Sequence, residues 1–544
     1  MKKAILLLMI MTFGFLIQTI SQNQNSSVWT SDLGNGKYKN PIIYADYSDP
    51  DVIRVGDDYY MTSSSFSNFP GLPILHSKDL VNWKLIAHAA IQYPDDSFNK
   101  PQHGNAIWAP SIRYHNNEFY IYFGDPDRGV FMTKAKKAEG PWEPLRLIKK
   151  VTGWIDCCPL WDDDGKTYLV HAFANSRSGI KSLLAVCPMN EEGTEVLETS
   201  TIVFNGQKDY PTIEGPKFYK RNGYYYIFAP AGGVKPGWQT VLRSKNVYGP
   251  YEDKIVLEQG STNINGPHQG GWVTTQTGED WFIHFQDRYA YGRVVHLNPM
   301  KWENDWPQMG VDYDANGIGE PVTEYTKPNI GASYPLMTPQ TSDTFESTQL
   351  GLQWQWNSNF NSNWYSLTEN PGWLRLFPEE VSETMNLWDI GRLLLQKTPA
   401  PKFSASTQLK FIANNVKEKA GLVVFGMDYS YIALEKTTDG YQITQTKCFD
   451  ANKGKSETLV EAVPFKSNSV YLKVEVHPED PSSIIPVVIC KFSYSSDGKK
   501  FIPFGEPFIA KEGRWVGAKV GVFSTSPDNN SSNYTDFDWF KIEK

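Results

Sequence analysis

A turn followed by an aromatic strand recurs five times in the first part of the chain. The copies are Asp57-Asp-Tyr-Tyr-Met61, Asn117-Glu-Phe-Tyr-Ile121, Gly165-Lys-Thr-Tyr-Leu169, Asn222-Gly-Tyr-Tyr-Tyr226 and Glu279-Asp-Trp-Phe-Ile283. Asn-Gly is a two-residue hairpin turn, and runs of Tyr, Phe and Ile favour a pleated, half-buried strand. The turns fall at residues 57, 117, 165, 223 and 279. Strand-only repeats of this length are typical of four-stranded propeller blades, so the repeat predicts a five-bladed β-propeller.

Polar and aromatic residues occupy matching positions ahead of these turns. Asp49, Trp108, Asp156 and Glu214 stand eight or nine residues before their turns, and His268 stands eleven residues before the fifth. The first strand of every blade lines the central channel, so equivalent positions should meet in one axial pocket. A single Asp in a Gly/Pro-rich segment is usually a turn former or a cap. Three carboxylates at matching repeat positions favour a shared pocket instead.

Two further segments are expected at this pocket. Ser64-Ser-Phe-Ser-Asn-Phe-Pro-Gly71 is a loop of small and aromatic residues suited to holding a sugar, and it contributes Phe66. Arg293 follows the fifth repeat, in Tyr291-Gly-Arg-Val-Val295. An arginine there can bind a substrate hydroxyl or a catalytic carboxylate, whereas an isolated arginine usually forms a surface ion pair.

Composition limits the partners of the chain. The 544 residues carry a formal net charge of −8 with no basic block, which argues against nucleic acid or an anionic membrane as the partner. Aromatic residues make up 14% of the chain, and while most should pack the sheets, such rings also stack on sugars. The five cysteines are Cys157, Cys158, Cys187, Cys448 and Cys490, which are too few and too scattered for a disulfide framework or a zinc site.

The N-terminus resembles a secretory signal peptide. Residues 1–21 combine two lysines, a long apolar run and small residues at Thr19 and Ser21. No cysteine follows the run, so no lipoprotein anchor is indicated, and no later segment is apolar enough to span a bilayer. We expect a secreted or periplasmic mature protein that does not insert into the membrane.

The rest of the chain divides into three parts, and the predicted fold class is all-β. The propeller is expected over residues 36–325, followed by a linker rich in Pro, Ser and Thr over 326–341. Residues 342–544 contain short alternating strands such as Ala405–Phe411 and Tyr471–Val476, which are typical of an antiparallel β-sandwich. This second domain could be a binding module or a wall that completes the pocket.

Three acids around one pocket suit the hydrolysis of glycosidic bonds. One carboxylic acid protonates the leaving oxygen, while another carboxylate activates water or attacks the anomeric carbon. A third acid can orient the proton donor and raise its pKa through like-charge repulsion. Glu214 has the longer reach and is a reasonable acid, and Asp49 is a reasonable base.

Four segments in one order carry a family resemblance. They are Ser48-Asp-Pro-Asp51, Ile107-Trp-Ala-Pro-Ser-Ile-Arg-Tyr-His115, Trp154-Ile-Asp-Cys-Cys-Pro-Leu-Trp161 and Ile213-Glu-Gly-Pro-Lys217. With them the sequence resembles glycoside hydrolase family 43, the five-bladed propeller β-xylosidases and α-L-arabinofuranosidases. Trp354-Gln-Trp356 and Phe537-Asp-Trp-Phe540 resemble the concanavalin A-like sandwich of its xylosidase-like members.

The resemblance implies a role for each residue of the pocket. Asp49 is then the general base, Asp156 the pKa modulator that orients the acid, and Glu214 the general acid of an inverting reaction. Arg293 matches the active-site arginine of the family, and His268 matches its pocket histidine. No cofactor is required, although a calcium ion lies by this histidine in some members; no cluster of oxygen ligands for it can be read from the sequence.

One departure from the family falls beside the modulator. Relatives commonly have a single small residue before the proline, whereas Cys157 and Cys158 precede Pro159 here. We expect both cysteines to be small buried residues of the wall, and the alternative is a redox pair.

The expected activity is exo-acting release of a pentose from hemicellulose-derived glycans, with an oligosaccharide or polysaccharide as the partner. The sequence does not rank β-D-xylose against α-L-arabinofuranose, because the two present similar hydroxyl patterns. A non-catalytic sugar-binding propeller is one alternative, but it would not need all three acids. A retaining fructan-type hydrolase is another, but it would begin with a Trp-Met-Asn-Asp-Pro-like motif, and here Tyr47-Ser48 precedes Asp49-Pro50.

Overall fold

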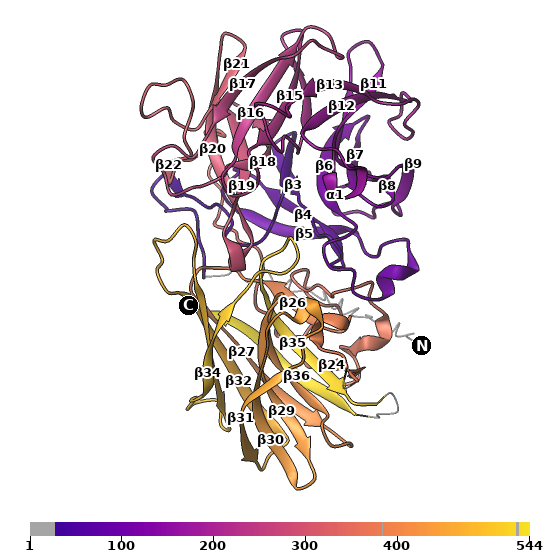
Figure 1. The fold of residues 1–544 in the computed structure, drawn as a ribbon. Helices are drawn as coiled ribbons and strands as arrows, with labels where there is room; N and C mark the ends of the chain where they lie inside the picture. Colours follow the sequence, from indigo (N-terminus) through magenta and orange to yellow (C-terminus); the bar gives the residue numbers. More distant parts are fainter. Residues whose placement is uncertain (1–27, 383, 529–532) are drawn as a thin grey trace, which may run out of the picture.

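The computed structural model describes residues 28–382, 384–528 and 533–544. The predicted signal peptide, residues 1–21, lies outside the described residues. The described chain is nearly all β, and a propeller of five sheets stacks on a sandwich of two sheets (Figure 1). No helix in these ranges is long and apolar enough to cross a membrane.

Five antiparallel sheets of four consecutive strands each form the propeller, which confirms the five predicted blades. Blades one to three contain β2 (Asp51–Val55), β3 (Asp58–Thr62), β4 (Gly71–Ser77), β5 (Trp83–Ala90); β6 (Trp108–His115), β7 (Glu118–Asp125), β8 (Gly129–Ala135), β9 (Arg146–Lys150); β10 (Trp154–Trp161), β11 (Thr167–Phe173), β12 (Leu183–Met189) and β13 (Thr201–Asn205). Blades four and five contain β14 (Lys217–Arg221), β15 (Tyr224–Ala231), β16 (Trp238–Ser244), β17 (Glu252–Leu257); β18 (His268–Thr274), β19 (Asp280–Asp287), β20 (Arg293–Glu303) and β21 (Trp306–Met309). The short helices are η1 (Asp96–Asn99), α1 (Asn175–Ser178), η2 (Tyr289–Tyr291), η3 (Ser362–Trp364), η4 (Leu387–Asp389) and η5 (Ala451–Lys453).

The Asn-Gly turn behaves as its sequence predicts. Arg221 pairs with Tyr224 across the β14–β15 hairpin, so Asn222 and Gly223 are the two turn residues. Their φ angles are +50° and +71°, and positive φ at both positions matches the right-handed twist of a hairpin. The aromatic strand that follows packs between blades, where Tyr226 is fully buried.

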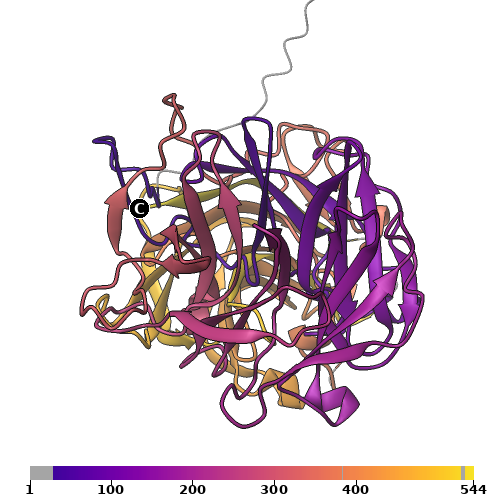
Figure 2. The same cartoon turned by 90° about the horizontal axis from the view of Figure 1, so that it is seen from above.

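The N-terminal segment helps to close the ring of blades. Ile43 and Val295 exchange backbone hydrogen bonds of 3.0 and 3.4 Å, which ties the segment before blade one to β20 of blade five. Outside the blades, β1 (Lys37–Lys39) pairs with β22 (Glu324–Thr326). Figure 2 views the molecule from the propeller end, with the sandwich behind the blades.

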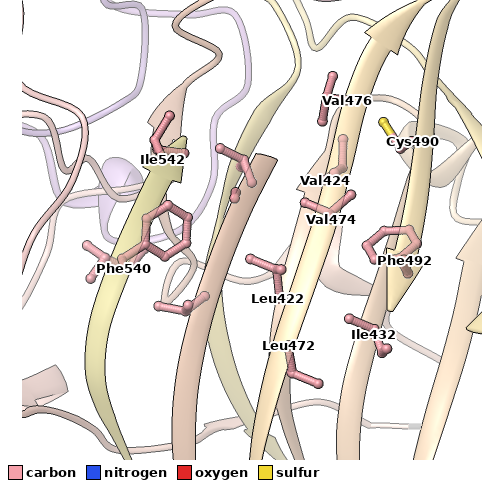
Figure 3. Close-up of a cluster of buried hydrophobic side chains, with 14 of the residues drawn as sticks. Leu422, Val424, Ile432, Leu472, Val474, Val476, Cys490, Phe492, Phe540 and Ile542 are labelled. Carbon is pink, nitrogen blue, oxygen red and sulfur yellow. The ribbon is translucent and has the colours of Figure 1, made fainter. Parts of the chain in front are cut away.

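The sandwich consists of two seven-stranded sheets. One sheet contains, in chain order, β23 (Tyr365–Ser366), β24 (Leu374–Leu376), β27 (Phe403–Ile412), β32 (Ser469–Pro478), β33 (Val488–Ser495), β34 (Ile502–Ala510) and β36 (Tyr534–Glu543). The other contains β25 (Glu379–Glu380), β26 (Leu394–Lys397), β28 (Lys419–Phe425), β29 (Tyr429–Thr437), β30 (Gly440–Cys448), β31 (Thr458–Phe465) and β35 (Lys519–Ser526). Alternate residues of facing strands fill the core, for example Leu422 and Val424 against Leu472 and Val474 (Figure 3). Burying one such side chain contributes about 1.5–3 kcal/mol.

The two domains are joined by backbone hydrogen bonds. Phe69 of the loop after β3 and Trp356 of the sandwich exchange bonds of 3.1 and 2.7 Å. Ala518, just before β35, donates to the Ala290 carbonyl at 2.7 Å. The interface therefore fixes two loops of the molecule, one from each domain, near the end of the propeller channel.

The cysteines are packing residues. Cys157 and Cys158 are fully buried free thiols that belong to different hydrophobic clusters on opposite sides of β10. The Cys158 sulfur accepts hydrogen bonds from the Phe218 N–H at 3.2 Å and from Arg113 at 2.7 Å. Because the two thiols point to opposite sides, the structure supports the predicted wall residues and not a redox pair.

Candidate active site

The residues predicted for the pocket meet at one end of the propeller channel. Asp49 precedes β2, Trp108 begins β6, Asp156 lies in β10, Glu214 precedes β14 and His268 begins β18. These residues, together with Phe66 and Arg293, line one cavity of about 110 Å³. Val234, Gln269, Ala109, Ile155 and Trp515 complete its lining.

An unusual backbone conformation recurs at this end of the blades. Each inner strand has a left-handed residue at or beside its pocket position, with φ of +53° at Asp49, +39° at Ala109, +59° at Asp156, +61° at Gly215 and +41° at Gln269. Non-glycine residues rarely adopt such angles, and they persist where the surrounding structure holds them at a functional site. The strand pairing also shifts register within β6, β10 and β18 beside these residues. Such bulges re-aim side chains, here into the channel.

Asp49 is held by two donors. The Ser64 hydroxyl donates to its Oδ2 at 2.6 Å, and Arg293 Nη1 lies 3.3 and 3.4 Å from its two oxygens. The same hydroxyl oxygen accepts the Ala109 N–H at 2.7 Å, which fixes the loop that carries Phe66 to blade two. Ser64 was not singled out from the sequence, because nothing in a Ser-rich loop distinguishes the serine that faces a carboxylate.

Asp156 and Glu214 are held close together by a backbone contact. The Gly215 N–H donates to Asp156 Oδ2 at 2.8 Å, so the residue after the glutamate binds the aspartate. Burial, followed by the charges of Asp156 and Asp49, raises the pKa of Glu214 to about 8, while the charge of Arg293 opposes the rise. Burial likewise raises the pKa of Asp156 to about 7. A carboxyl group that retains its proton at neutral pH can act as an acid.

His268 contributes a neutral ring to the pocket. It is 1% exposed, and its Nε2 lies 3.5 Å from Glu214 Oε1. Burial, with the charge of Arg293, lowers the pKa of His268 to about 3. The imidazole is therefore uncharged, and it can donate one hydrogen bond and accept another.

A calcium ion beside His268 stays an expectation from the family resemblance. Calcium takes about six to eight oxygen ligands. No group of three or more His, Cys, Asp or Glu residues that could hold a metal ion occurs in the described ranges. The Arg293 charge also acts on the same imidazole and would repel a cation. No step of the reaction is assigned to a metal.

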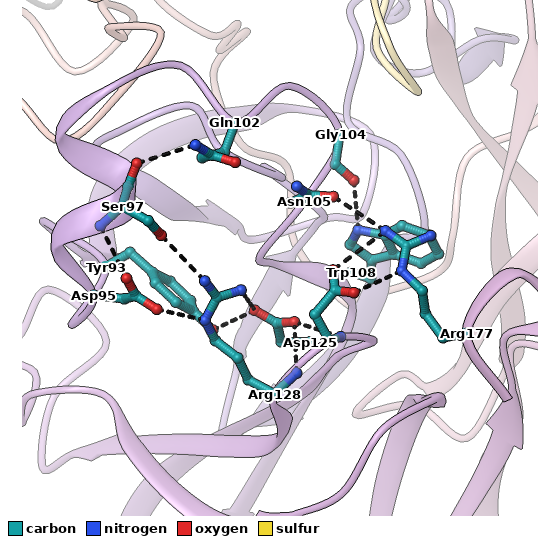
Figure 4. A network of polar contacts seen from close by, with 11 residues as sticks. Tyr93, Asp95, Ser97, Gln102, Gly104, Asn105, Trp108, Asp125, Arg128 and Arg177 are labelled. Atoms are coloured by element: carbon teal, nitrogen blue, oxygen red, sulfur yellow. Dashed lines mark hydrogen bonds and ion pairs between the residues drawn. The ribbon is translucent and has the colours of Figure 1, made fainter.

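Aromatic rings form the walls of the pocket. Phe66 and Trp108 meet at an angle, with ring centroids 6.2 Å apart. The Trp108 Nε1 donates to the Gly104 carbonyl at 2.8 Å, and Figure 4 shows the indole beside Gly104 and Asn105. Arg177 binds the Asn105 side chain at 3.3 Å, which steadies the loop ahead of β6.

The sandwich supplies one wall residue. Trp515 lies between β34 and β35, is 45% exposed and has a φ of +65°. A bulky residue in the left-handed region is strained and is typical of a functional position. Of the two roles considered for the second domain, the structure thus favours the wall of the pocket. The sequence offers only a weak signal for this residue, a tryptophan between Gly513 and Gly517.

Both domains of the chain match models of known protein families. Residues 38–307 match the model of glycosyl hydrolases family 43, and residues 342–543 match that of the beta xylosidase C-terminal concanavalin A-like domain. A putative beta-xylosidase of Xylanibacter ruminicola is 40% identical over 497 residues, covering 91% of this chain and 87% of the relative. A non-reducing end alpha-L-arabinofuranosidase of Bacteroides ovatus is 30% identical over 93% of this chain and 95% of its own. The solved structure of a xylan beta-1,4-xylosidase from Bacillus halodurans superposes with a TM-score of 0.82 at 25% identity. The match covers 93% of this chain and 100% of that chain.

Proposed function

The chain belongs to glycoside hydrolase family 43, and from that premise we propose that it is an exo-acting, inverting enzyme that releases a terminal pentose from hemicellulose-derived glycans. The pentose is α-L-arabinofuranose or β-D-xylose, because similar relatives are named for each activity. The strongest support is the convergence of Asp49, Asp156 and Glu214 in one small cavity. A cavity of about 110 Å³ walled by aromatic rings suits a single terminal sugar rather than the middle of a chain.

Glu214 acts as the general acid in this proposal. Its raised pKa keeps the carboxyl group protonated at neutral pH, and the group transfers that proton to the glycosidic oxygen as the bond to the anomeric carbon breaks. The side chain is 26% exposed, so the leaving alcohol can depart to solvent. Asp156 supports the acid in two ways. Its negative charge raises the pKa of Glu214, and its carboxylate accepts the N–H of the neighbouring Gly215.

Asp49 acts as the general base. A water molecule attacks the anomeric carbon from the face opposite the leaving group and gives one proton to the Asp49 carboxylate. The result is a free pentose of inverted configuration. Ser64 and Arg293 hold the Asp49 oxygens in place for this transfer, while His268, Phe66 and Trp108 bind and orient the sugar ring.

Two measurements test the proposal. Hydrolysis of p-nitrophenyl α-L-arabinofuranoside and β-D-xylopyranoside should show cleavage of at least one, with Asp49→Ala inactive on both. Proton NMR of the first sugar released should show the anomer opposite to that of the substrate. A product that retains the substrate configuration would replace inversion with the double displacement of fructan-type hydrolases. Binding of arabinoxylan without any cleavage would support a non-catalytic sugar-binding propeller.

A further inference from the structure

Asp46 connects the sandwich to the active-site arginine. Its Oδ1 accepts the backbone N–H of Arg293 at 2.9 Å, and its Oδ2 accepts the backbone N–H of Gly517 at 2.9 Å. The residue is 4% exposed. One carboxylate thus joins the start of β20 in the propeller to the sandwich loop that carries Trp515.

The backbone around Asp46 is shaped for this contact. Gly292 has a φ of +77°, and a Cβ there would lie 2.5 Å from the Asp46 Cγ. A Cβ on Gly517 would lie 2.6 Å from the Gly292 nitrogen. Both positions therefore require glycine, and the two backbone segments lie in direct contact.

The charge of Asp46 acts on two lysines, the buried Lys519 and the half-buried Lys397. Burial lowers the pKa of Lys397 and of Lys519, and the Asp46 charge opposes the lowering in both. Lys519 donates to the side chain of Asn68, and the Lys397 ammonium lies 5.0 Å from the centre of the Tyr47 ring. A buried carboxylate is costly unless it is hydrogen-bonded and near positive charge, and Asp46 meets both conditions only while the two domains are docked.

We infer that Asp46 is a positioning residue of the active site: it fixes the backbone at Arg293, and so makes the contact of that guanidinium with Asp49 depend on the docked sandwich loop. Arg293 Nη1 lies 3.3 Å from Asp49 Oδ1, so a shift at the start of β20 moves the group that holds the base. The inference rests on the proposed hydrolase function. It assigns the sandwich a part in catalysis beyond the wall formed by Trp515.

Asp46→Asn is the first test, because the amide keeps the size of the side chain but leaves one acceptor oxygen for two N–H groups. We expect kcat/KM on the p-nitrophenyl glycoside that the wild type cleaves to fall by roughly ten- to a hundredfold. Asp343→Asn is the matched control. Asp343 is also 4% exposed and accepts the N–H groups of Phe345 and Gly351, at 2.9 and 3.2 Å, inside the sandwich. The Asp343→Asn variant should have a lower Tm than wild type but a kcat/KM within about twofold of the wild-type value.

A double-mutant cycle separates positioning from simple loss of stability. If Asp46 acts through Arg293, adding Asp46→Asn to Arg293→Lys should cost less than about twofold in kcat/KM. The inference is overturned if Asp46→Asn lowers kcat/KM by the same factor with and without Arg293→Lys. It is also overturned if Asp343→Asn loses as much activity as Asp46→Asn. If Asp46→Asn does not fold, Asp46→Ser, which removes the same carboxylate with a smaller side chain, enters the same cycle. A wild-type protein that cleaves neither glycoside overturns the proposed function and this inference together, whereas an active wild type with an additive cycle overturns the inference alone.

Discussion

The rings of Trp108 and Trp515 meet edge to face, with centroids 6.1 Å apart and planes at 66°, although one belongs to the propeller and the other to the sandwich. Both line the cavity that holds the three carboxylates. The pocket is therefore lined by residues of both domains, and Trp515 is the residue that the sandwich contributes to it.

Replacing Trp515 by alanine should weaken substrate handling without unfolding the protein. The ring is 45% exposed, so its loss costs little burial, but it opens one wall of the cavity. We expect kcat/KM to fall roughly tenfold, mostly through a higher KM, with Tm nearly unchanged. Phe449→Ala removes a ring that is 56% exposed and does not line the cavity, and it should leave both kinetic constants as they are. Equal effects of the two substitutions would remove Trp515 from the site.

Replacing Glu214 by alanine should affect substrates according to their leaving groups. Protonation matters most when the leaving alcohol is a poor leaving group and matters little for an activated aryl glycoside. We expect a loss of roughly a thousandfold on pentose oligosaccharides and a much smaller loss on an activated aryl glycoside such as a dinitrophenyl glycoside. Asp49→Ala should abolish both reactions, because no other carboxylate of the site is assigned to activate water. If Glu214→Ala loses the same factor on both substrates, Glu214 is not the acid.

Much of the propeller and of the pocket at its end could be predicted because both follow from a local repeat. Each turn and its aromatic strand are contiguous in the sequence, so counting back from the turns reaches the pocket position of every blade. His268 is offset because the hairpin of its blade is longer: Thr274 pairs with Asp280, whereas Arg221 pairs with Tyr224 in blade four. The repeat thus predicts the position even where the spacing changes.

The contacts between domains could not be predicted, because they join segments with no local pattern in common. Asp46 and Gly517 are 471 residues apart, and neither belongs to a repeat or a motif. Trp515 is one of 18 tryptophans, most of which pack sheets, and its conformation at positive φ is not visible in the sequence. Such residues are found only when the docked structure places them against the site.

Replacing Asp156 by asparagine should shift the pH profile of the reaction. The charge of Asp156 is the largest electrostatic contribution that raises the pKa of Glu214, after burial itself. Without that charge Glu214 loses its proton at a lower pH, so the alkaline limb of kcat/KM should move to lower pH. A pH-rate series with wild type and Asp156→Asn measures the shift. An alkaline limb that stays in place would show that Asp156 acts only through geometry.

The raised pKa of Glu214 also predicts how stability changes with pH. A carboxyl group with a pKa of about 8 in the folded protein, against an ordinary value of 4.5, binds its proton more tightly in the folded state than in the unfolded state. The contribution of Glu214 to the free energy of unfolding is therefore lost as pH rises from about 4.5 to about 8, and the ionised group then destabilises the fold. Glu214→Gln removes this titration, so the variant should gain about 1–3 kcal/mol in free energy of unfolding over wild type at pH 9 and little at pH 4.

Thermal unfolding between pH 4 and pH 9 measures the difference, and Glu479→Gln, at a solvent-exposed glutamate, serves as the control. A stability difference between Glu214→Gln and wild type that is the same at both ends of the range would contradict the raised pKa and, with it, the protonated acid on which the proposed mechanism depends.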